Sequence, residues 1–170
     1  MTCLACGTRA CWGELVRSET KYLTLLLVED SPDDAFLFEL ALRKTGLVYS
    51  LHHAANGKEA VEYLESALGP QGPDLPQFVF LDLNMPVMNG FQVLKWIKRQ
   101  SFPASTRVIV LSGFDHLEDV HRAAKCGMSE YVLKPIDVAN LSRILQGGVS
   151  LGMKHQATSP QPDDGRNPRS

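Results

Sequence analysis

The sequence predicts an α/β protein built on a doubly wound, five-stranded parallel sheet. Short runs of Leu, Val, Ile and Phe recur along the chain, and such runs are typical of strands that are buried on both faces. Stretches with helical periodicity lie between them. Because five strands alternate with five helices, we expect parallel pairing through right-handed crossovers. The 170 residues are enough for one domain of ordinary size.

The first half of the chain supplies two strands and two helices. An apolar run bounded by charge, Tyr22–Val28, predicts the first strand. A helix follows because Ser31 can cap it, Pro32 suits its first position and acids suit its first turn; we expect it to end at Gly46. A weaker strand and a second amphipathic helix come next, at Ser50–Ala54 and Lys58–Leu68.

The second half begins after a loop, since residues 69–77 contain two glycines and three prolines. Three further apolar runs predict buried strands, at Phe78–Leu83, Val108–Leu111 and Tyr131–Leu133. The helices expected between and after them are Phe91–Arg99, Leu117–Cys126 and Val138–Gln146. The Lys134-Pro135 pair suggests a tight turn with a cis peptide bond.

Both ends of the chain lie outside this pattern, which assigns residues 22–147 to the domain. We expect residues 1–21 to be a flexible leader and the polar residues 148–170 to be a disordered tail. Three leader cysteines, Cys3, Cys6 and Cys11, lack the second pair of a structural zinc site. Two interpretations of these cysteines remain: they bind a metal, or they are reduced and lie in a mobile segment.

Charge and hydropathy exclude several classes of function. The net charge of -2 gives no bulk attraction to DNA or to anionic lipid. No apolar run approaches the roughly 20 residues of a membrane-spanning helix, and the N-terminus lacks a secretory signal. We therefore expect a cytoplasmic protein with neither a DNA nor a membrane partner.

Polar residues stand where four of the predicted strands end. Glu29 and Asp30 follow the first strand, Asp82 lies in the third, Ser112 follows the fourth and Lys134 follows the fifth. Ligands of open parallel sheets bind at this edge, so we expect these side chains to converge. Three carboxylates together require a cation, and their hard oxygens favour Mg²⁺. With Lys134 and Ser112 they describe a site for a transferable phosphoryl group, although Asp82 alone is equally well explained as a helix cap or turn residue.

These residues and their surroundings resemble the receiver domain of two-component response regulators. The matching motifs are Glu29-Asp30, Asp82 in L-D-L-N-M-P-V-M-N-G, Ser112 in V-L-S-G, and Lys134-Pro135 in Y-V-L-K-P. The resemblance covers about residues 23–145. It implies a flavodoxin-like sheet with strand order 2-1-3-4-5. It also implies that the protein is a signalling switch that slowly dephosphorylates itself, and not an enzyme that acts on other substrates.

The resemblance also implies a role for each site residue. Asp82 would accept a phosphoryl group from a histidine of a sensor kinase. Mg²⁺ would be bound directly by Asp30, Asp82 and the backbone carbonyl of Asn84, and through water by Glu29. Lys134 would hold a phosphoryl oxygen.

Two further residues are implied to act as the switch. Ser112 would swing to bind the phosphoryl group, and the rotamer of Tyr131 would report the state of Ser112. An ordinary tyrosine at the edge of the sheet remains the alternative for Tyr131.

The opening V-E-D-S-P-D-D and the loop at residues 69–77 resemble single-domain regulators that are paired with phytochrome-type kinases. The loop is also explained as an unrelated insertion. Because about 23 polar residues after the last helix are too few for a DNA-binding domain, we expect the signal to leave by protein contact. The partners are then a sensor histidine kinase and either a histidine phosphotransfer protein or a docking target. The surface formed by the last two helices and the fifth strand is explained either as a homodimer interface or as a face exposed to solvent.

The first helix is unusually apolar, because seven of the eight residues in Ala35–Leu42 are apolar. A stripe facing the core needs only three to four per two turns. We therefore expect Phe36 or Phe38 to form part of a patch that docks onto the kinase. The rival explanation is that Trp12 and Leu15 of the leader cover them.

Other classes of function are weighed against the switch. A haloacid-dehalogenase-type phosphatase also uses an aspartate nucleophile, but it expects a second acid where Asn84 stands. A pseudo-receiver acting only as a binding module normally loses Asp82, Lys134 or an acidic ligand. A flavin-binding flavodoxin needs a Ser/Thr-rich phosphate loop, where Glu29 and Asp30 would repel phosphate.

Overall fold

The structure is a computed structural model, and it describes residues 22–149 except for residues 101, 114 and 115. The predictions for the leader, its cysteines and the tail lie outside these residues. The elements alternate strictly: β1 (Leu23–Val28), α1 (Pro32–Lys44), β2 (Tyr49–Ala54), α2 (Gly57–Leu68), β3 (Phe78–Asp82), α3 (Gly90–Arg99), β4 (Arg107–Ser112), α4 (Leu117–Lys125), β5 (Glu130–Leu133) and α5 (Val138–Val149). None of the described helices is long and apolar enough to cross a membrane.

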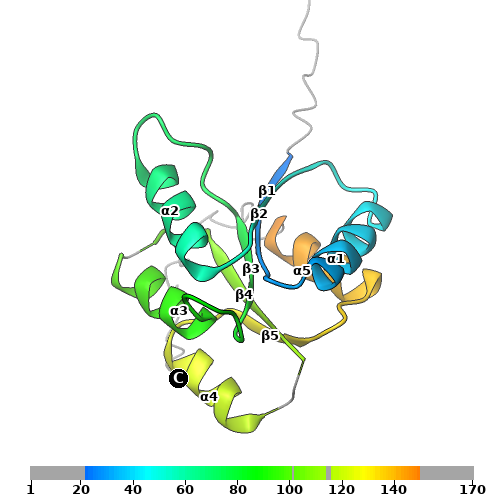
Figure 1. Cartoon of the computed structure of the whole chain (residues 1–170). Coiled ribbons are helices and arrows are strands. Elements are labelled where there is room, and N and C mark those ends of the chain that lie inside the picture. Colours follow the sequence, from blue (N-terminus) through cyan, green and yellow to red (C-terminus); the bar gives the residue numbers. More distant parts are fainter. Residues whose placement is uncertain (1–21, 101, 114–115, 150–170) are drawn as a thin grey trace, which may run out of the picture.

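The five strands form one sheet in the order β2-β1-β3-β4-β5, and every neighbouring pair is parallel. Figure 1 shows α1 and α5 on one side of this sheet and α2, α3 and α4 on the other. The predicted fold class and strand order are both confirmed. The predicted cis peptide bond between Lys134 and Pro135 is present as well.

The sheet separates two hydrophobic clusters because successive side chains of a strand point to opposite faces. Leu25 and Leu27 of β1 pack with α1 and α5, whereas Leu26 and Val28 pack with α2 and α3. Every residue of β1 and β3 is buried. The acidic residues at the ends of these two strands are therefore carried by the best-packed part of the molecule.

Local sequence fixes where the helices next to the site begin. The Ser31 hydroxyl accepts a hydrogen bond from the Asp34 backbone N–H at 3.3 Å, which caps α1 as predicted. Asn89 and Gln92 form a capping box at α3. Gly90 opens α3 so close to β3 that an added Cβ would lie 2.2 Å from the Asp82 carbonyl oxygen. Only glycine allows this helix to start against the strand end.

The structure corrects two expectations about exposure. Phe36 or Phe38 was expected on the docking patch, and Phe38 is ruled out because it is 3% exposed and its ring centre lies 4.8 Å from that of Phe80 in the core. Phe36, which is 64% exposed, lies on the outer side of α1. The strand predicted at Tyr131–Leu133 is half-buried rather than buried, because β5 is the edge strand and pairs with β4 alone.

Candidate functional site

Three carboxylates meet where β1 and β3 end. Val28 of β1 pairs with Leu81 of β3, so the residues that follow, Glu29 and Asp82, lie side by side. A carboxylate oxygen from each of Glu29, Asp30 and Asp82 lies within 4.8 Å of the others. Glu29 and Asp82 are buried, whereas Asp30 is exposed. The predicted convergence of these side chains is confirmed.

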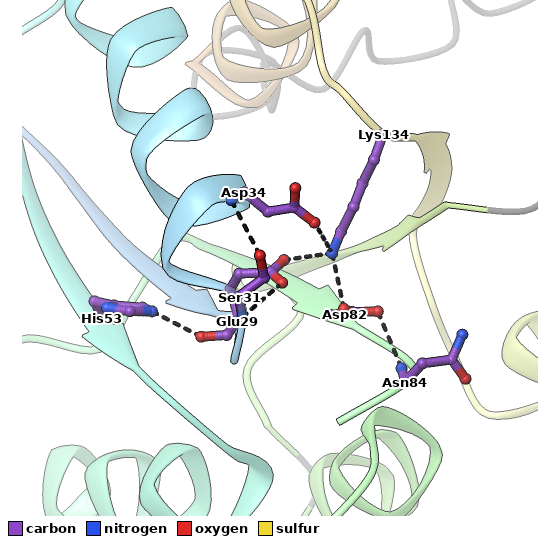
Figure 2. A network of polar contacts seen from close by, with 7 residues as sticks. All are labelled: Glu29, Ser31, Asp34, His53, Asp82, Asn84 and Lys134. Carbon is purple, nitrogen blue, oxygen red and sulfur yellow. Dashed lines mark hydrogen bonds and ion pairs between the residues drawn. The ribbon is translucent and has the colours of Figure 1, made fainter. Parts of the chain in front are cut away.

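Lys134 brings a positive charge to this cluster from the far edge of the sheet. Its Nζ lies 2.6 Å from Glu29 Oε2 and 2.8 Å from Asp82 Oδ2. Figure 2 draws both contacts as dashed lines. A third carboxylate oxygen, Asp34 Oδ2, lies 3.1 Å away. Burial by itself lowers the pKa of Lys134, but its hydrogen bonds with Asp82, Glu29 and Asp34 outweigh burial and hold the pKa above its ordinary value. The ammonium group therefore remains charged.

Asp82 has a partner on each carboxylate oxygen. Its Oδ2 accepts from Lys134, and its Oδ1 accepts from the backbone N–H of Asn84 at 3.0 Å. The Asn84 side chain is exposed. These two hydrogen bonds fix the direction of the Asp82 carboxylate.

Glu29 is the most deeply buried acid of the site. Burial raises the pKa of its carboxyl above the ordinary value; hydrogen bonding with Lys134 opposes this rise, and the charge of Asp82 adds to it. The Glu29 Oε1 accepts from the Ser31 backbone N–H at 3.3 Å. On the other side, the Glu29 carbonyl oxygen lies 2.8 Å from His53 Nε2 of β2. Both contacts hold the turn between β1 and α1.

The two predicted switch residues lie on β4 and β5, on the Lys134 side of the site. Ser112 is buried at the end of β4 and pairs with Leu133, next to Lys134. Its carbonyl oxygen accepts from the Lys134 backbone N–H at 2.8 Å. Tyr131 pairs with Val110, two residues before Ser112, and so belongs to the same face of the sheet. It is half-buried against the cluster under α2, α3 and α4.

The donor set fits a divalent cation such as Mg²⁺. Glu29, Asp30 and Asp82 offer hard carboxylate oxygens, which this ion prefers. Lys134 offsets part of the negative charge of this cluster, and a dication would offset more of it. The same acidic triad is typical of magnesium sites in receiver domains.

Asp34 and His53 belong to the polar network but were not found from the sequence. Asp34 is one of the acids that suit the first turn of the predicted first helix, a role it also has in α1. One feature of the sequence could have indicated that Asp34 lies near the site: it follows Asp30 by four residues, in the first turn of the helix that begins beside the first strand. His53 lies in the weak strand β2, and no pattern in the sequence connects it with Glu29.

Comparison with known proteins places the chain in a family. A family model described as "Response regulator receiver domain" matches residues 25–146. The chain is 31% identical over 134 residues to the probable methanogenesis regulatory protein FilR2 of Methanothrix harundinacea, covering 79% of this chain and 85% of that protein. It is 34% identical over 122 residues to the nitrate/nitrite response regulator NarL of Escherichia coli, covering 72% of this chain and 52% of NarL.

Solved structures agree with this assignment. The bacteriophytochrome response regulator AtBRR matches with a TM-score of 0.63 and 27% identity, covering 82% of this chain and 99% of that one. The phosphorylated cyanobacterial phytochrome response regulator RcpA matches with a TM-score of 0.61 and 28% identity, covering 75% of this chain and 91% of that one. The chain therefore belongs to the response regulator receiver domain family, a signalling module rather than an enzyme.

Proposed function

We propose that the chain is a response regulator whose receiver unit, residues 22–147, accepts a phosphoryl group on Asp82. The observation that carries this proposal is the position of Lys134, whose ammonium group bonds to Asp82 and Glu29 beside an acidic triad. A carboxylate that is buried, oriented and next to a fixed cation is suited to attack phosphorus.

In the proposed step, one Asp82 carboxylate oxygen attacks the phosphorus of a phosphohistidine on a sensor kinase. The new O–P bond forms as the P–N bond breaks, and the electron pair of that bond returns to the imidazole nitrogen. Lys134 then bonds to a phosphoryl oxygen and balances part of its charge. Mg²⁺, held by Glu29, Asp30, Asp82 and the Asn84 carbonyl, would supply further neutralisation of the phosphoryl charge.

Ser112 and Tyr131 are proposed to report the phosphoryl group. Ser112 stands at the end of β4, one position beyond the residue that pairs with Asp82, and its backbone is bonded to that of Lys134. A hydroxyl at this place can turn toward a group on Asp82. Tyr131 lies on the neighbouring strand and on the same face, which suits a side chain that responds to Ser112.

The partner is proposed to be a sensor histidine kinase, and more narrowly a phytochrome-type kinase. The likeness to AtBRR and RcpA, whose names connect them with phytochromes, supports the narrower form. Onward transfer to a histidine phosphotransfer protein remains part of the proposal. A homodimer through the last two helices and the fifth strand also remains a prediction.

The docking patch for the kinase is proposed to centre on Phe36, with Leu37 and Leu40 beside it. All three are exposed on α1, and α1 begins at the site. Phe36→Ala is expected to slow phosphotransfer from a kinase while leaving phosphorylation by acetyl phosphate and thermal stability unchanged. Phe38→Ala, as the matched core variant, is expected to lower stability instead. Equal losses with both phosphoryl donors would contradict docking.

The proposed function is tested by incubating the protein with acetyl phosphate and Mg²⁺ and following its intact mass. We expect a gain of one phosphoryl group that chelation of Mg²⁺ prevents and that Asp82→Asn abolishes. Glu65→Gln, an exposed acid on α2, is the control and should behave as wild type. A folded protein that gains no mass would instead be a binding module.

A further inference from the structure

The contact between Asp34 and Lys134 has no role in the proposed phosphoryl transfer. It joins the first turn of α1 to the residue after β5, with Asp34 Oδ2 and Lys134 Nζ 3.1 Å apart. In Figure 2, Asp34 and Asp82 approach the Lys134 ammonium group from opposite sides. Asp34 is not part of the acidic triad formed by Glu29, Asp30 and Asp82.

The three carboxylates around Lys134 use its full hydrogen-bonding capacity. An ammonium group has three N–H donors, and its partners here are Glu29, Asp82 and Asp34. A phosphoryl group on Asp82 would bring three strong acceptor oxygens to the same place. If Lys134 keeps its bond to Asp82, it can bond to one of these oxygens only by giving up Glu29 or Asp34.

Asp34 is the partner that can be released at the lowest cost. The Glu29 side chain is 2% exposed, so losing Lys134 would leave a buried charge unpaired. The Asp34 side chain is 42% exposed and water can take the place of Lys134. A cavity of about 20 Å³ next to Asp34, Leu37 and Lys134 has room for one such water. The Asp34 contact is also the longest of the three.

We propose that Asp34 is a restraining residue, which holds Lys134 toward α1 in the unphosphorylated protein and releases it when Asp82 carries a phosphoryl group. This inference rests on the proposed function of Asp82. The contact opposes phosphorylation, because part of the Lys134 interaction must be lost first. It also links the occupancy of Asp82 to α1, the helix with the exposed apolar residues Phe36 and Leu37.

The matched variants are Asp34→Asn and Asp33→Asn. Both acids lie in the first turn of α1 and stabilise the helix in the same way, but Asp33 is exposed and has no bond with Lys134 among the contacts of the described residues. The difference between the two variants therefore isolates the contact with Lys134. Asp34→Glu keeps the charge and serves as the rescue variant.

Two measurements are made on the full chain. The first follows phosphorylation by acetyl phosphate and Mg²⁺ by intact mass; Asp34→Asn should be labelled about two- to fivefold faster than Asp33→Asn, in line with the loss of one partly exposed ion pair. The second follows hydrogen exchange in residues 35–38 without Mg²⁺. Exchange should be faster in Asp34→Asn than in Asp33→Asn, and Asp34→Glu should restore slow exchange.

Phosphorylation of the wild type should speed up exchange in residues 35–38, whereas Asp34→Asn should show little further change. Equal labelling rates for the two asparagine variants, or slower labelling of Asp34→Asn, would overturn the inference. A folded wild type that takes no phosphoryl group would overturn the proposed function as well. In that case the exchange measurement without Mg²⁺ still shows separately whether Asp34 holds α1.

Discussion

The two halves of the site are held in different ways. Glu29, Asp30 and Asp82 follow or end β1 and β3, in which every residue is buried. Lys134 follows the half-buried edge strand β5, and Ala123 is the single buried residue among those described in the neighbouring helix α4. Regions with few buried contacts open at low free energy. The acceptor is thus fixed by the core, while Lys134 and Tyr131 lie on or next to the less buried edge strand, where displacement costs less.

The sharpest test of this difference compares two leucines that directly precede site residues. Leu81 precedes Asp82 and is fully buried, whereas Leu133 precedes Lys134 and is 47% exposed. Leu81→Ala should lower the free energy of unfolding by about 2–5 kcal/mol. Leu133→Ala should lower it by about 0.5 kcal/mol or less. Urea unfolding measures both, and losses of similar size would contradict the comparison.

Binding of Mg²⁺ should stabilise the wild type by about 2.7 kcal/mol at a concentration of 100 times Kd. Glu29→Gln should reduce this stabilisation, because one carboxylate of the triad is lost. Thermal unfolding with and without Mg²⁺ measures the effect. Glu62→Gln, an exposed acid on α2, is the control and should retain the full gain. Full stabilisation of Glu29→Gln would show that Glu29 does not contribute to the cation site.

Without Mg²⁺, Glu29→Gln should be more stable than the wild type at neutral pH. Burial raises the pKa of the Glu29 carboxyl above 4.5, so the folded protein binds this proton more tightly than the unfolded chain. The stability that this group contributes is therefore present at low pH and is lost as the pH rises through the folded-state pKa. The advantage of the variant should vanish in acid. Lys134 keeps Asp82 and Asp34 as partners, so the substitution leaves no unpaired cation.

Two glycines extend the comparison to the backbone. Gly90→Ala would place a Cβ 2.2 Å from the Asp82 carbonyl oxygen, and it should lower the free energy of unfolding by about 1–3 kcal/mol. Gly113 follows β4, and an added Cβ there meets nothing within 4 Å. Gly113→Ala should therefore change stability by less than about 1 kcal/mol. Chemical denaturation distinguishes the two, and a tolerated Gly90→Ala would show that the end of β3 can shift.

The smallest expected loss of stability comes from removing a contact that holds α4 against α3. The Arg122 guanidinium lies 4.0 Å from the centre of the Phe91 ring, and Lys98 of α3 donates to the Lys125 carbonyl oxygen at 2.8 Å. Arg122→Ala should cost about 0.5–1 kcal/mol, the value of an exposed cation–π contact. Hydrogen exchange should become faster in α4 but not in α3. Arg99→Ala, exposed on α3, is the control; unchanged exchange in α4 would mean that other contacts hold it.

The sequence was most informative about the carboxylate half. The runs before Glu29 and Asp82 are apolar apart from Thr24, and the carboxyl ends of parallel strands share one edge, so the meeting of these residues could be predicted from the pattern alone. Lys134 was placed correctly for the same reason. The burial of β5, which precedes Lys134, was predicted less well. Its three apolar residues predict a buried strand whether β5 is an edge strand or has neighbours on both sides.

The remaining errors have physical causes that a single sequence does not reveal. In Ala35–Leu42 the apolar residues cover nearly the whole helix, so periodicity does not indicate which side faces the sheet. Phe38 was therefore as reasonable a choice as Phe36 until its contact with Phe80 was known. Asp34 and Lys134 are 100 residues apart in the chain, and only the fold shows that they meet.

The separation of the two hydrophobic clusters by the sheet has a consequence for how the sequence can evolve. Among the described residues, the buried side chains packed with α1 and α5 form a cluster separate from those packed with α2 and α3. Substitutions in α1 and in α3, which lie on opposite sides of the sheet (Figure 1), should therefore have additive free energies of unfolding, since distant sites without shared partners behave independently. The α1 side can acquire a new binding preference while the packing beneath α3 stays as it is.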